Sequence, residues 1–267
     1  METQRIAVKV GTSTLTHSNG AANLQRMEQL VRTLADLKNT GYEVVLITSG
    51  AIGIGAQKLR LSERPTALAK KQAAAAVGQC AMMHLYDKFF SEYSITVGQI
   101  LMTLDDVRNE ANRQHLLNTF HALLDFGVLP IVNENDSVSH EQIASKDNIF
   151  GDNDTLSAVV ADMCGCDLLV LLSDIDGLYD SDPRQNPDAS IIETVTELTR
   201  QIRQSAAPAG SARGTGGMIT KLQAAELCQT AGIDMVIANG ARPEDLYRIA
   251  SGEKVGTRFL FKKDNLS

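Results

Sequence analysis

Short, largely apolar runs rich in β-branched residues recur along the chain, separated by longer segments whose apolar residues follow a helical spacing. Runs of this kind predict strands of a parallel sheet that is covered on both faces. The predicted strands are Arg5–Val10, Glu43–Thr48, Val128–Val132, Asp167–Leu172 and Asp234–Ala238, with Ile95–Leu101 as a further candidate.

The segments between these strands predict helices. Apolar residues from Leu24 to Leu37 recur at helical spacing, and Gly41 follows where a helix commonly ends. Thr66–Tyr93 is a long alanine-rich stretch, and the apolar face of Leu116–Leu124 ends before Gly127. Strands that alternate with helices in this way predict an α/β fold, a three-layer αβα sandwich around a largely parallel central sheet.

The second half of the chain continues the alternation. After the Asp167–Leu172 strand we expect a helical stretch over Thr194–Ser205, a small-residue segment over Ala206–Gly217, and a further helix. We expect a single domain over residues 1–267 with two lobes, 1–165 and 166–267, because no Pro/Ser-rich linker separates them.

Composition narrows the class of protein. At 267 residues, 43% of them apolar, the chain can bury a large core, which excludes a disordered chain. The net charge of -7 and the scattered Lys and Arg argue against a nucleic-acid partner. No run approaches the roughly 20 apolar residues that span a bilayer, and no signal peptide opens the chain, so we expect a cytoplasmic protein without membrane contact.

Cysteine and histidine form no metal or redox pattern. Cys164-Gly165-Cys166 has a spacing that suggests metal or redox chemistry, but packing in the core is the favoured interpretation. The cysteines, which have no paired metal-ligand spacing, are Cys80, Cys164, Cys166 and Cys228. The histidines, expected to be structural or at the surface, are His17, His84, His115, His121 and His140. We therefore expect no protein-bound metal.

Polar residues follow the predicted strands, where ligands of open parallel sheets bind. The first strand contains Lys9 and leads to Gly11, and Ser49-Gly50 follows the second, so both offer backbone N–H groups to an anion. Asn133-Glu134-Asn135-Asp136 ends the Val128 strand, and Gly151-Asp152-Asn153-Asp154 precedes the next helix. Each group alone could be a cap or a turn, but together they predict a binding site.

A second group of residues suits a polyphosphate. Gly214-Thr215-Gly216-Gly217-Met218 precedes a helix that contains Lys221, which combines flexible backbone donors, a helix N-terminus and an ammonium group. Ser173-Asp174 follows another strand. Leu222 follows Lys221, so this is not a Walker A loop, and no strand–helix junction carries a complete dinucleotide fingerprint. A different nucleotide-binding family is required.

In this order, four segments resemble the amino-acid kinase superfamily, and within it the branch that phosphorylates glutamate. The segments are Val8–Ser13, Thr48–Ile52, Val132–Asp136 with Gly151–Asp154, and Gly214–Met218 with Lys221. The resemblance covers nearly the whole chain. It implies the amino-acid kinase fold and ATP-dependent phosphorylation of the γ-carboxylate of L-glutamate to L-glutamyl 5-phosphate, the first step of proline biosynthesis. One mild departure is Ser173, where family members more often have Thr.

The resemblance also implies roles for individual residues. Lys9 and Lys221 would act on the phosphates, with Asp154 orienting both lysines. The residues that would hold or surround glutamate are Ser49, Asn133, Asp136, Asp152 and Asn153. The residues that would contact ATP are Lys9, Gly11, Ser173, Asp174, Thr215, Gly216, Gly217, Met218, Ile219, Thr220 and Lys221. Mg²⁺ should accompany ATP as a charge neutraliser.

Such a reaction needs charge compensation more than it needs a base. A glutamate side chain, with an ordinary pKa of about 4.3, is already ionised at neutral pH and can attack phosphorus directly. The carboxylate must, however, approach an anionic triphosphate, and Lys9 and Lys221 can supply the opposing charge.

Two other functions stay open. Another kinase of the superfamily, acting on acetylglutamate, aspartate, carbamate or UMP, would share the lysine and glycine framework, although Asn133–Asp136 with Gly151–Asp154 favours free glutamate. A silent amino-acid or nucleotide sensor would bind without turnover, against which Lys9 and Lys221 argue. The resemblance further implies a homo-oligomer, and it leaves open both feedback inhibition by proline and the role of Lys146. Many family members carry a C-terminal PUA domain, which we do not expect in this chain.

Overall fold

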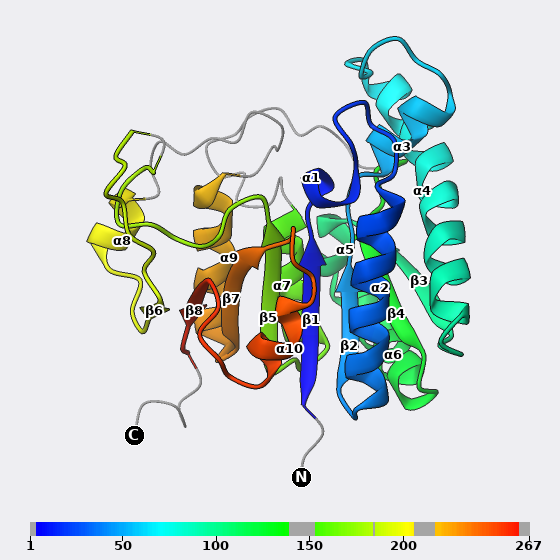
Figure 1. The fold of residues 1–267 in the computed structure, drawn as a ribbon. Helices are drawn as coiled ribbons and strands as arrows, with labels where there is room; N and C mark the ends of the chain where they lie inside the picture. The colour runs from blue at the N-terminus through cyan, green and yellow to red at the C-terminus, as the bar shows by residue number, and fades with distance from the viewer. Residues whose placement is uncertain (1–3, 139–152, 184, 206–216, 262–267) are drawn as a thin grey trace.

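A single mixed sheet forms the centre of the molecule (Figure 1). The computed structural model describes residues 4–138, 153–183, 185–205 and 217–261. In these ranges the strands are β1 (Arg5–Val10), β2 (Glu43–Ile47), β3 (Val97–Met102), β4 (Leu129–Glu134), β5 (Leu168–Ser173), β6 (Thr194–Val195), β7 (Asp234–Asn239) and β8 (Thr257–Phe259). Their spatial order is β3-β4-β2-β1-β5-β7-β8-β6. In this spatial order, every neighbouring pair from β3 through β4, β2, β1 and β5 to β7 is parallel. Strand β8 runs antiparallel to β7, and β6 pairs in parallel with β8.

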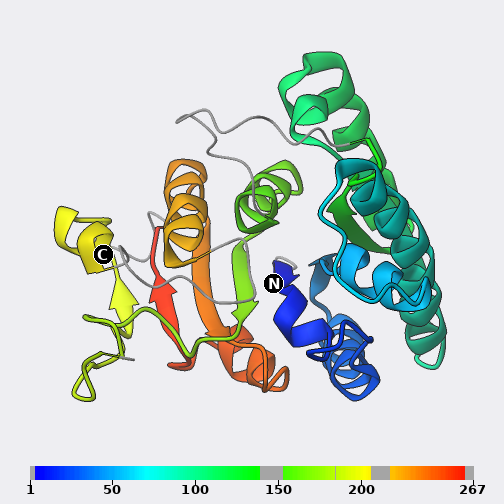
Figure 2. The same cartoon turned by 90° about the horizontal axis from the view of Figure 1, so that it is seen from above.

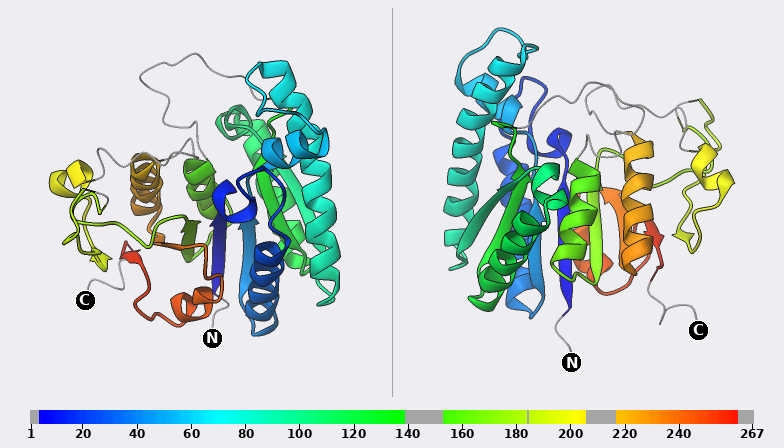
Figure 3. Two further views of the ribbon diagram at one scale, coloured as in Figure 1. Left: turned by 45° about the horizontal axis from the view of Figure 1, so that its top comes forward. Right: turned by 180° about the vertical axis from the view of Figure 1, so that it is seen from behind.

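Helices cover both faces of this sheet, as the view from above shows (Figure 2). The helices are α1 (Thr12–Leu15), α2 (Leu24–Asn39), α3 (Ala51–Lys58), α4 (Leu68–Ser91), α5 (Leu104–Arg108), α6 (Glu110–Asp125), α7 (Asn153–Met163), α8 (Arg200–Ser205), α9 (Met218–Ala231) and α10 (Asp245–Ala250). One face carries α2, α4 and α10, and the opposite face carries α6, α7 and α9 (Figure 3). The predicted three-layer α/β sandwich is confirmed.

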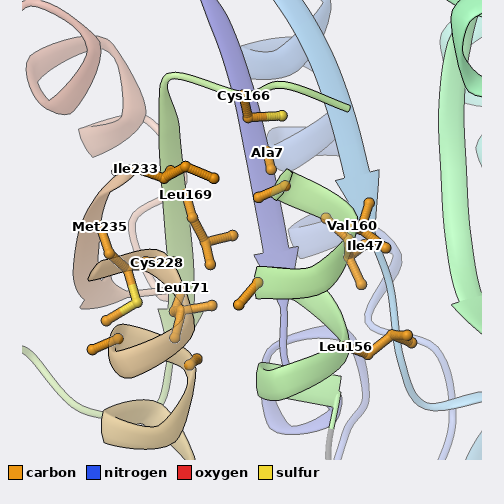
Figure 4. Packing of buried hydrophobic residues seen from close by; sticks show 14 of the residues in the cluster. Ala7, Ile47, Leu156, Val160, Cys166, Leu169, Leu171, Cys228, Ile233 and Met235 are labelled. Carbon is orange, nitrogen blue, oxygen red and sulfur yellow. The ribbon is translucent and has the colours of Figure 1, made fainter. Parts of the chain in front are cut away.

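Two hydrophobic cores lie on the two faces, because successive residues of a strand point to opposite sides. Ala7 and Leu169 belong to the core beneath α7 and α9 (Figure 4), whereas the next residues, Val8 and Val170, belong to the core beneath α2 and α4. All four are fully buried. Burying a residue such as Leu or Val completely contributes about 1.5–3 kcal/mol. Strands apolar on both faces are therefore held from both sides, as the sequence predicted.

Local signals fix the ends of α2. The side chain of Asn23 accepts a hydrogen bond from the backbone N–H of Arg26 at 3.1 Å, which caps the first turn. After the helix, Gly41 has φ +107, a left-handed conformation that glycine adopts without strain. The chain then turns directly into β2, so the predicted end of this helix is confirmed.

Helices α3 and α4 cross with their backbones in close contact. A Cβ atom at Gly55 would lie 1.7 Å from the carbonyl oxygen of Ala74, and one at Gly78 would lie 1.8 Å from that of Ala51. Glycine at both positions is what allows the helices to approach. The contact holds the start of α3, just after β2, against the middle of α4.

The expectation of one helical stretch over Thr194–Ser205 is wrong in its first part. Thr194–Val195 forms β6, and a helix begins only at Arg200. Thr194 pairs with Arg258 and Val195 with Phe259, residues more than sixty positions further along the chain. Two residues carry too little pattern to reveal such a strand, which exists because β8 offers a pairing edge.

The remaining expectations concern cysteines and membrane contact. Cys164, Cys166 and Cys228 are buried, and burial raises the pKa of the Cys228 thiol to about 12. Cys80 is exposed on α4. Within the described ranges, no helix combines the length and apolar character needed to cross a bilayer.

Candidate functional site

A cavity of about 580 Å³ opens at the carboxyl ends of the central strands. From β1 the chain proceeds to β2 on one side and later to β5 on the other, so this is the point where the strand order switches. Such switch points are where open α/β sheets bind ligands. The carboxyl ends of β1 and β5 lie beside α1 at the upper end of the sheet in Figure 1. The predicted residues that line the cavity are Lys9, Gly11, Ser49, Asn133, Asp136, Asn153, Asp154, Ser173, Asp174 and Lys221.

Three buried charged residues, Lys9, Asp154 and Lys221, form one wall of this cavity, which we call the lysine wall. The Nζ atom of Lys9 donates to Oδ1 of Asp154, and the Nζ atom of Lys221 donates to Oδ2 at 3.0 Å. The exposed fractions of these side chains are 8% for Lys9, 6% for Lys221 and 1% for Asp154. Burial raises the pKa of Asp154, but the two ammonium groups together outweigh burial and hold it well below its ordinary value.

These charges come from three different elements. Lys9 lies on β1, Asp154 in the first turn of α7, and Lys221 in the first turn of α9. The Oγ1 atom of Thr220 lies 3.0 Å from Oδ2 of Asp154 and 2.9 Å from the carbonyl oxygen of Gly217, so it joins the α9 terminus to the same carboxylate. Asp154 thereby connects the two halves of the sheet.

Another part of the cavity lining, which we call the amide wall, carries hydroxyl and amide groups. The Oγ atom of Ser49 donates to the carbonyl oxygen of Val10 at 2.8 Å. The Nδ2 atom of Asn153 lies 3.3 Å from the carbonyl oxygen of Thr48 and 3.4 Å from Oδ1 of Asn133. This wall therefore joins β2, β4 and α7 through hydrogen bonds.

One carboxylate of this wall has an altered pKa. Asp136 follows β4 and is partly buried beside the cavity. Burial, and secondarily the neighbouring charge of Glu134, raises the pKa of Asp136 to about 6. A cation arriving in the cavity would favour the ionised form.

Some predicted residues lie elsewhere. Met218 packs in the hydrophobic core, and Ile219 is 54% exposed. Neither is among the residues that line the cavity, so their contact with ATP stays a prediction. Asp152, Thr215 and Gly216, together with Lys146 and His140, fall outside the described residues.

Sequence reasoning missed part of the cavity. Its rim includes residues 17–20 and 62–64, and His17, which we expected only to be structural or at the surface, is exposed on that rim. These segments come from a turn after α1 and from the connection between α3 and α4. No motif marks them, because they reach the cavity only through the fold. Where the described residues are concerned, no group of three or more His, Cys, Asp or Glu could hold a metal ion.

Two lysines and a carboxylate buried at the switch point of an α/β sheet form a cluster that can stabilise an anionic group. The chain matches the model of the amino acid kinase family over residues 4–239, and it belongs to this family. Solved structures share the fold: UMP kinase from Ureaplasma parvum has a TM-score of 0.67 at 15% identity, covering 97% of this chain and 100% of that one. Carbamate kinase from Giardia lamblia has a TM-score of 0.69 at 15% identity, covering 97% and 99%.

The similar curated proteins narrow this class to one kind of kinase. A glutamate 5-kinase of Clostridium perfringens is 54% identical over 98% of this chain and 97% of its own length. Glutamate 5-kinases of Listeria innocua, 47% identical over 99% and 95%, and Caldanaerobacter subterraneus, 51% identical over 98% and 69%, are also similar. Within its family, the chain therefore groups with the glutamate 5-kinases.

Proposed function

We propose that the cavity described above is the active site of a glutamate 5-kinase. The chain phosphorylates L-glutamate with ATP, the first step of proline biosynthesis, as befits its family. The reaction joins the γ-phosphoryl group of ATP to the γ-carboxylate of glutamate, giving L-glutamyl 5-phosphate and ADP. The observation that carries the assignment of the site is the buried Lys9–Asp154–Lys221 cluster. The same cavity is lined by the hydroxyl and amide groups of the amide wall.

Electrostatic stabilisation is the main work of this site. A glutamate carboxylate attacks phosphorus without losing a proton, so no base is needed. Negative charge accumulates on the transferred group and on the leaving ADP, and preorganised cations stabilise it most when water is excluded. Lys9 and Lys221 provide these cations, and each is positioned by one carboxylate oxygen of Asp154. Asp154 also offsets the repulsion between the two ammonium groups.

The amide wall would receive the amino acid. Asp136 offers a carboxylate to the α-ammonium group of glutamate, and Ser49, Asn133 and Asn153 offer hydroxyl and amide groups. Binding an ammonium group would return the raised pKa of Asp136 towards its ordinary value. This wall, contributed by residues 1–165, would hold glutamate, whereas residues 166–267 would supply most contacts to ATP.

For the nucleotide, Ser173 is the last residue of β5 and Asp174 follows it on the cavity wall, and Gly11 lies near Lys9. A Cβ atom at Gly11 would lie 4.0 Å from Nζ of Lys9, so the backbone N–H of Gly11 is placed near the lysine that would contact the phosphates. Mg²⁺ would enter with ATP, held mainly by phosphate oxygens and water.

The test is to detect an acyl phosphate. Purified protein with ATP and Mg²⁺ should form a hydroxylamine-trappable product from glutamate, with one ADP per product. Parallel reactions with acetylglutamate, aspartate, and bicarbonate plus ammonia should give much less. Product from another acceptor would reassign the substrate, and nucleotide or amino-acid binding without ADP would favour a sensor.

Two further properties belong to the same proposal, and a third stays open. We expect a cytoplasmic enzyme that is assembled as a homo-oligomer, whereas the resemblance leaves open whether proline inhibits its activity. Size measurement in solution tests the assembly, and titration of proline into the acyl-phosphate assay tests the inhibition.

A further inference from the structure

Three side-chain amides form a chain that runs from the cavity wall into the interior. Asn153 on α7 contacts Asn133 on β4, with 3.4 Å between Nδ2 and Oδ1. Asn133 in turn donates from Nδ2 to Oε1 of Gln79 on α4, at 2.9 Å. Asn133 and Gln79 are only 2% and 8% exposed. Asn153 and Asn133 line the cavity, whereas Gln79 lies behind them.

One backbone group fixes the direction of the whole chain. The carbonyl oxygen of Thr48 can only accept, so Asn153 must turn its NH₂ group towards it. The same NH₂ group then meets the oxygen of Asn133, and the NH₂ group of Asn133 meets the oxygen of Gln79. Reversing any one amide would place two donors or two acceptors against each other.

This orientation has a cost at its inner end. The Nε2 atom of Gln79 is buried, and within the described part of the chain it has no hydrogen-bond partner. An unpaired buried donor destabilises a protein. Turning Gln79 over would not remove the conflict, because its NH₂ group would then face that of Asn133. The fold therefore leaves the NH₂ group of Gln79 unpaired while its oxygen accepts a hydrogen bond from Asn133.

At its outer end, the chain leaves an acceptor available. Both contacts of Asn153 use Nδ2, and among the described residues none donates to its Oδ1. Asn153 is partly exposed on the cavity wall. An amide oxygen and the Asp136 carboxylate are both acceptors, which suits an ammonium group and not an N-acylated nitrogen.

We propose that Gln79 is a positioning residue for amino-acid recognition, which holds Asn133 and, through it, keeps Oδ1 of Asn153 available to the α-ammonium group. This inference rests on the proposed function, since it specifies how glutamate is bound. Without the acceptor of Gln79, the buried NH₂ group of Asn133 would lose its partner, and Asn133 would no longer be held with its oxygen towards Asn153. Asn153 would then be held by the carbonyl oxygen of Thr48 alone, so its Oδ1 would be fixed less firmly where the ammonium group must bind.

The test compares two substitutions of similar size. Gln79→Met removes the acceptor, whereas Gln79→Glu keeps an oxygen facing Asn133. Gln79→Met should raise the KM for glutamate about tenfold, with the KM for ATP unchanged, because one buried hydrogen bond is lost on the amino-acid side only. Gln79→Glu should stay within about threefold of the parent protein. Gln114→Met is the matched control, because Gln114 bonds to Asn118 on the exposed face of α6.

Several outcomes would overturn the proposal. An unchanged glutamate KM in Gln79→Met, an equal rise of both substrates' KM values, or equal effects of the two substitutions would each do so. If Gln79→Met does not fold, Gln79→Glu decides alone, since a tenfold rise in its glutamate KM contradicts the proposed role. If the parent protein forms no glutamyl phosphate, the proposed function fails separately, and glutamate binding measured by calorimetry on the same variants tests the amide chain.

Discussion

The two walls of the cavity solve opposite problems with different chemistry. The lysine wall, formed by Lys9, Asp154 and Lys221, concentrates charge. Asp154 is almost inaccessible to solvent and accepts hydrogen bonds from both lysines. The amide wall carries the carboxylates of Asp136 and Glu134 but depends mainly on the direction of its hydrogen bonds. Charge can stabilise a phosphoryl group of any origin, whereas directed donors and acceptors distinguish one amino acid from another.

This difference predicts how the walls respond to substitution. A change in the lysine wall should reduce kcat with little effect on glutamate binding. A change in the amide wall should raise the KM for glutamate and leave the chemical step nearly intact. Substitutions in the two walls test that division.

The largest effect is expected for Asp154→Asn. It removes the negative charge that both buried ammonium groups contact, which should destabilise the protein by about 3–5 kcal/mol. Turnover should fall at least a thousandfold, because neither lysine stays aimed. Denaturant unfolding and the acyl-phosphate assay measure the two effects. Asp162→Asn is the control on the same helix. Asp162 is exposed, and its Oδ2 atom lies 3.9 Å from Nη2 of Arg113, so the free energy of unfolding should change by less than about 0.5 kcal/mol.

Lys221→Ala should separate the two walls most clearly. Asp154 keeps its partner Lys9, so the fold should survive, but one of the two phosphate-facing cations is gone. We expect kcat to fall about 100–1,000-fold, with the glutamate dissociation constant changed less than about threefold. Calorimetry and steady-state kinetics test this. Lys88→Ala on the exposed side of α4 is the control. A variant that loses glutamate binding and keeps kcat would reverse the assignment of the walls.

Sequence could predict the residues that line the cavity better than those that lie behind it, for a physical reason. Lys9, Ser49, Asn133 and Ser173 lie at or just beyond strand ends, and parallel strands bring all such positions to one edge. The pattern of the strands alone therefore implies that these residues lie close together. Asp154 and Lys221 each lie in the first turn of a helix beside that edge.

Gln79 and the short strands could not be found in this way. Gln79 is in an alanine-rich helix, and its partner Asn133 is 54 positions away. Its role depends on how α4 lies against β4, which no local pattern specifies. Likewise β6 forms because β8 provides an edge. Local spacing predicts which face of an element is buried, but not which distant residue it meets.

Gly78→Ala should disturb the frame behind the amide wall. The new Cβ atom would lie 1.8 Å from the carbonyl oxygen of Ala51, a backbone atom that cannot turn aside. Forcing α3 from α4 should destabilise by about 3 kcal/mol, lowering Tm by about 6–12 °C. Gly53→Ala on α3 is the control for stability, because no atom lies within 4 Å of its added Cβ. A Tm for Gly78→Ala equal to that of Gly53→Ala would show that the helices can separate freely.

The smallest change in stability, with the opposite sign, is expected for Asp136→Asn. The folded protein binds the proton of Asp136 more tightly than the unfolded chain, since burial and Glu134 raise its pKa from 3.8 to about 6. The protonated carboxyl group of Asp136 therefore stabilises the fold relative to the ionised carboxylate. This contribution is complete below pH 3.8 and is lost as pH rises through about 6. Replacing it with a neutral amide should raise Tm at pH 7.5 by about 2–4 °C, and the gain should shrink as pH falls towards 4.

The same substitution should raise the KM for glutamate at least tenfold, because the ammonium group loses its ionic partner. In the parent protein, the KM should rise as pH falls below 6, and Asp136→Asn should abolish that dependence. Thermal unfolding and kinetics between pH 5 and pH 8 measure both effects, with Asp87→Asn on the exposed side of α4 as control. If Asp136→Asn lowered kcat at saturating glutamate as strongly as Lys221→Ala does, Asp136 would act on the phosphoryl group, and the division between the walls would fail.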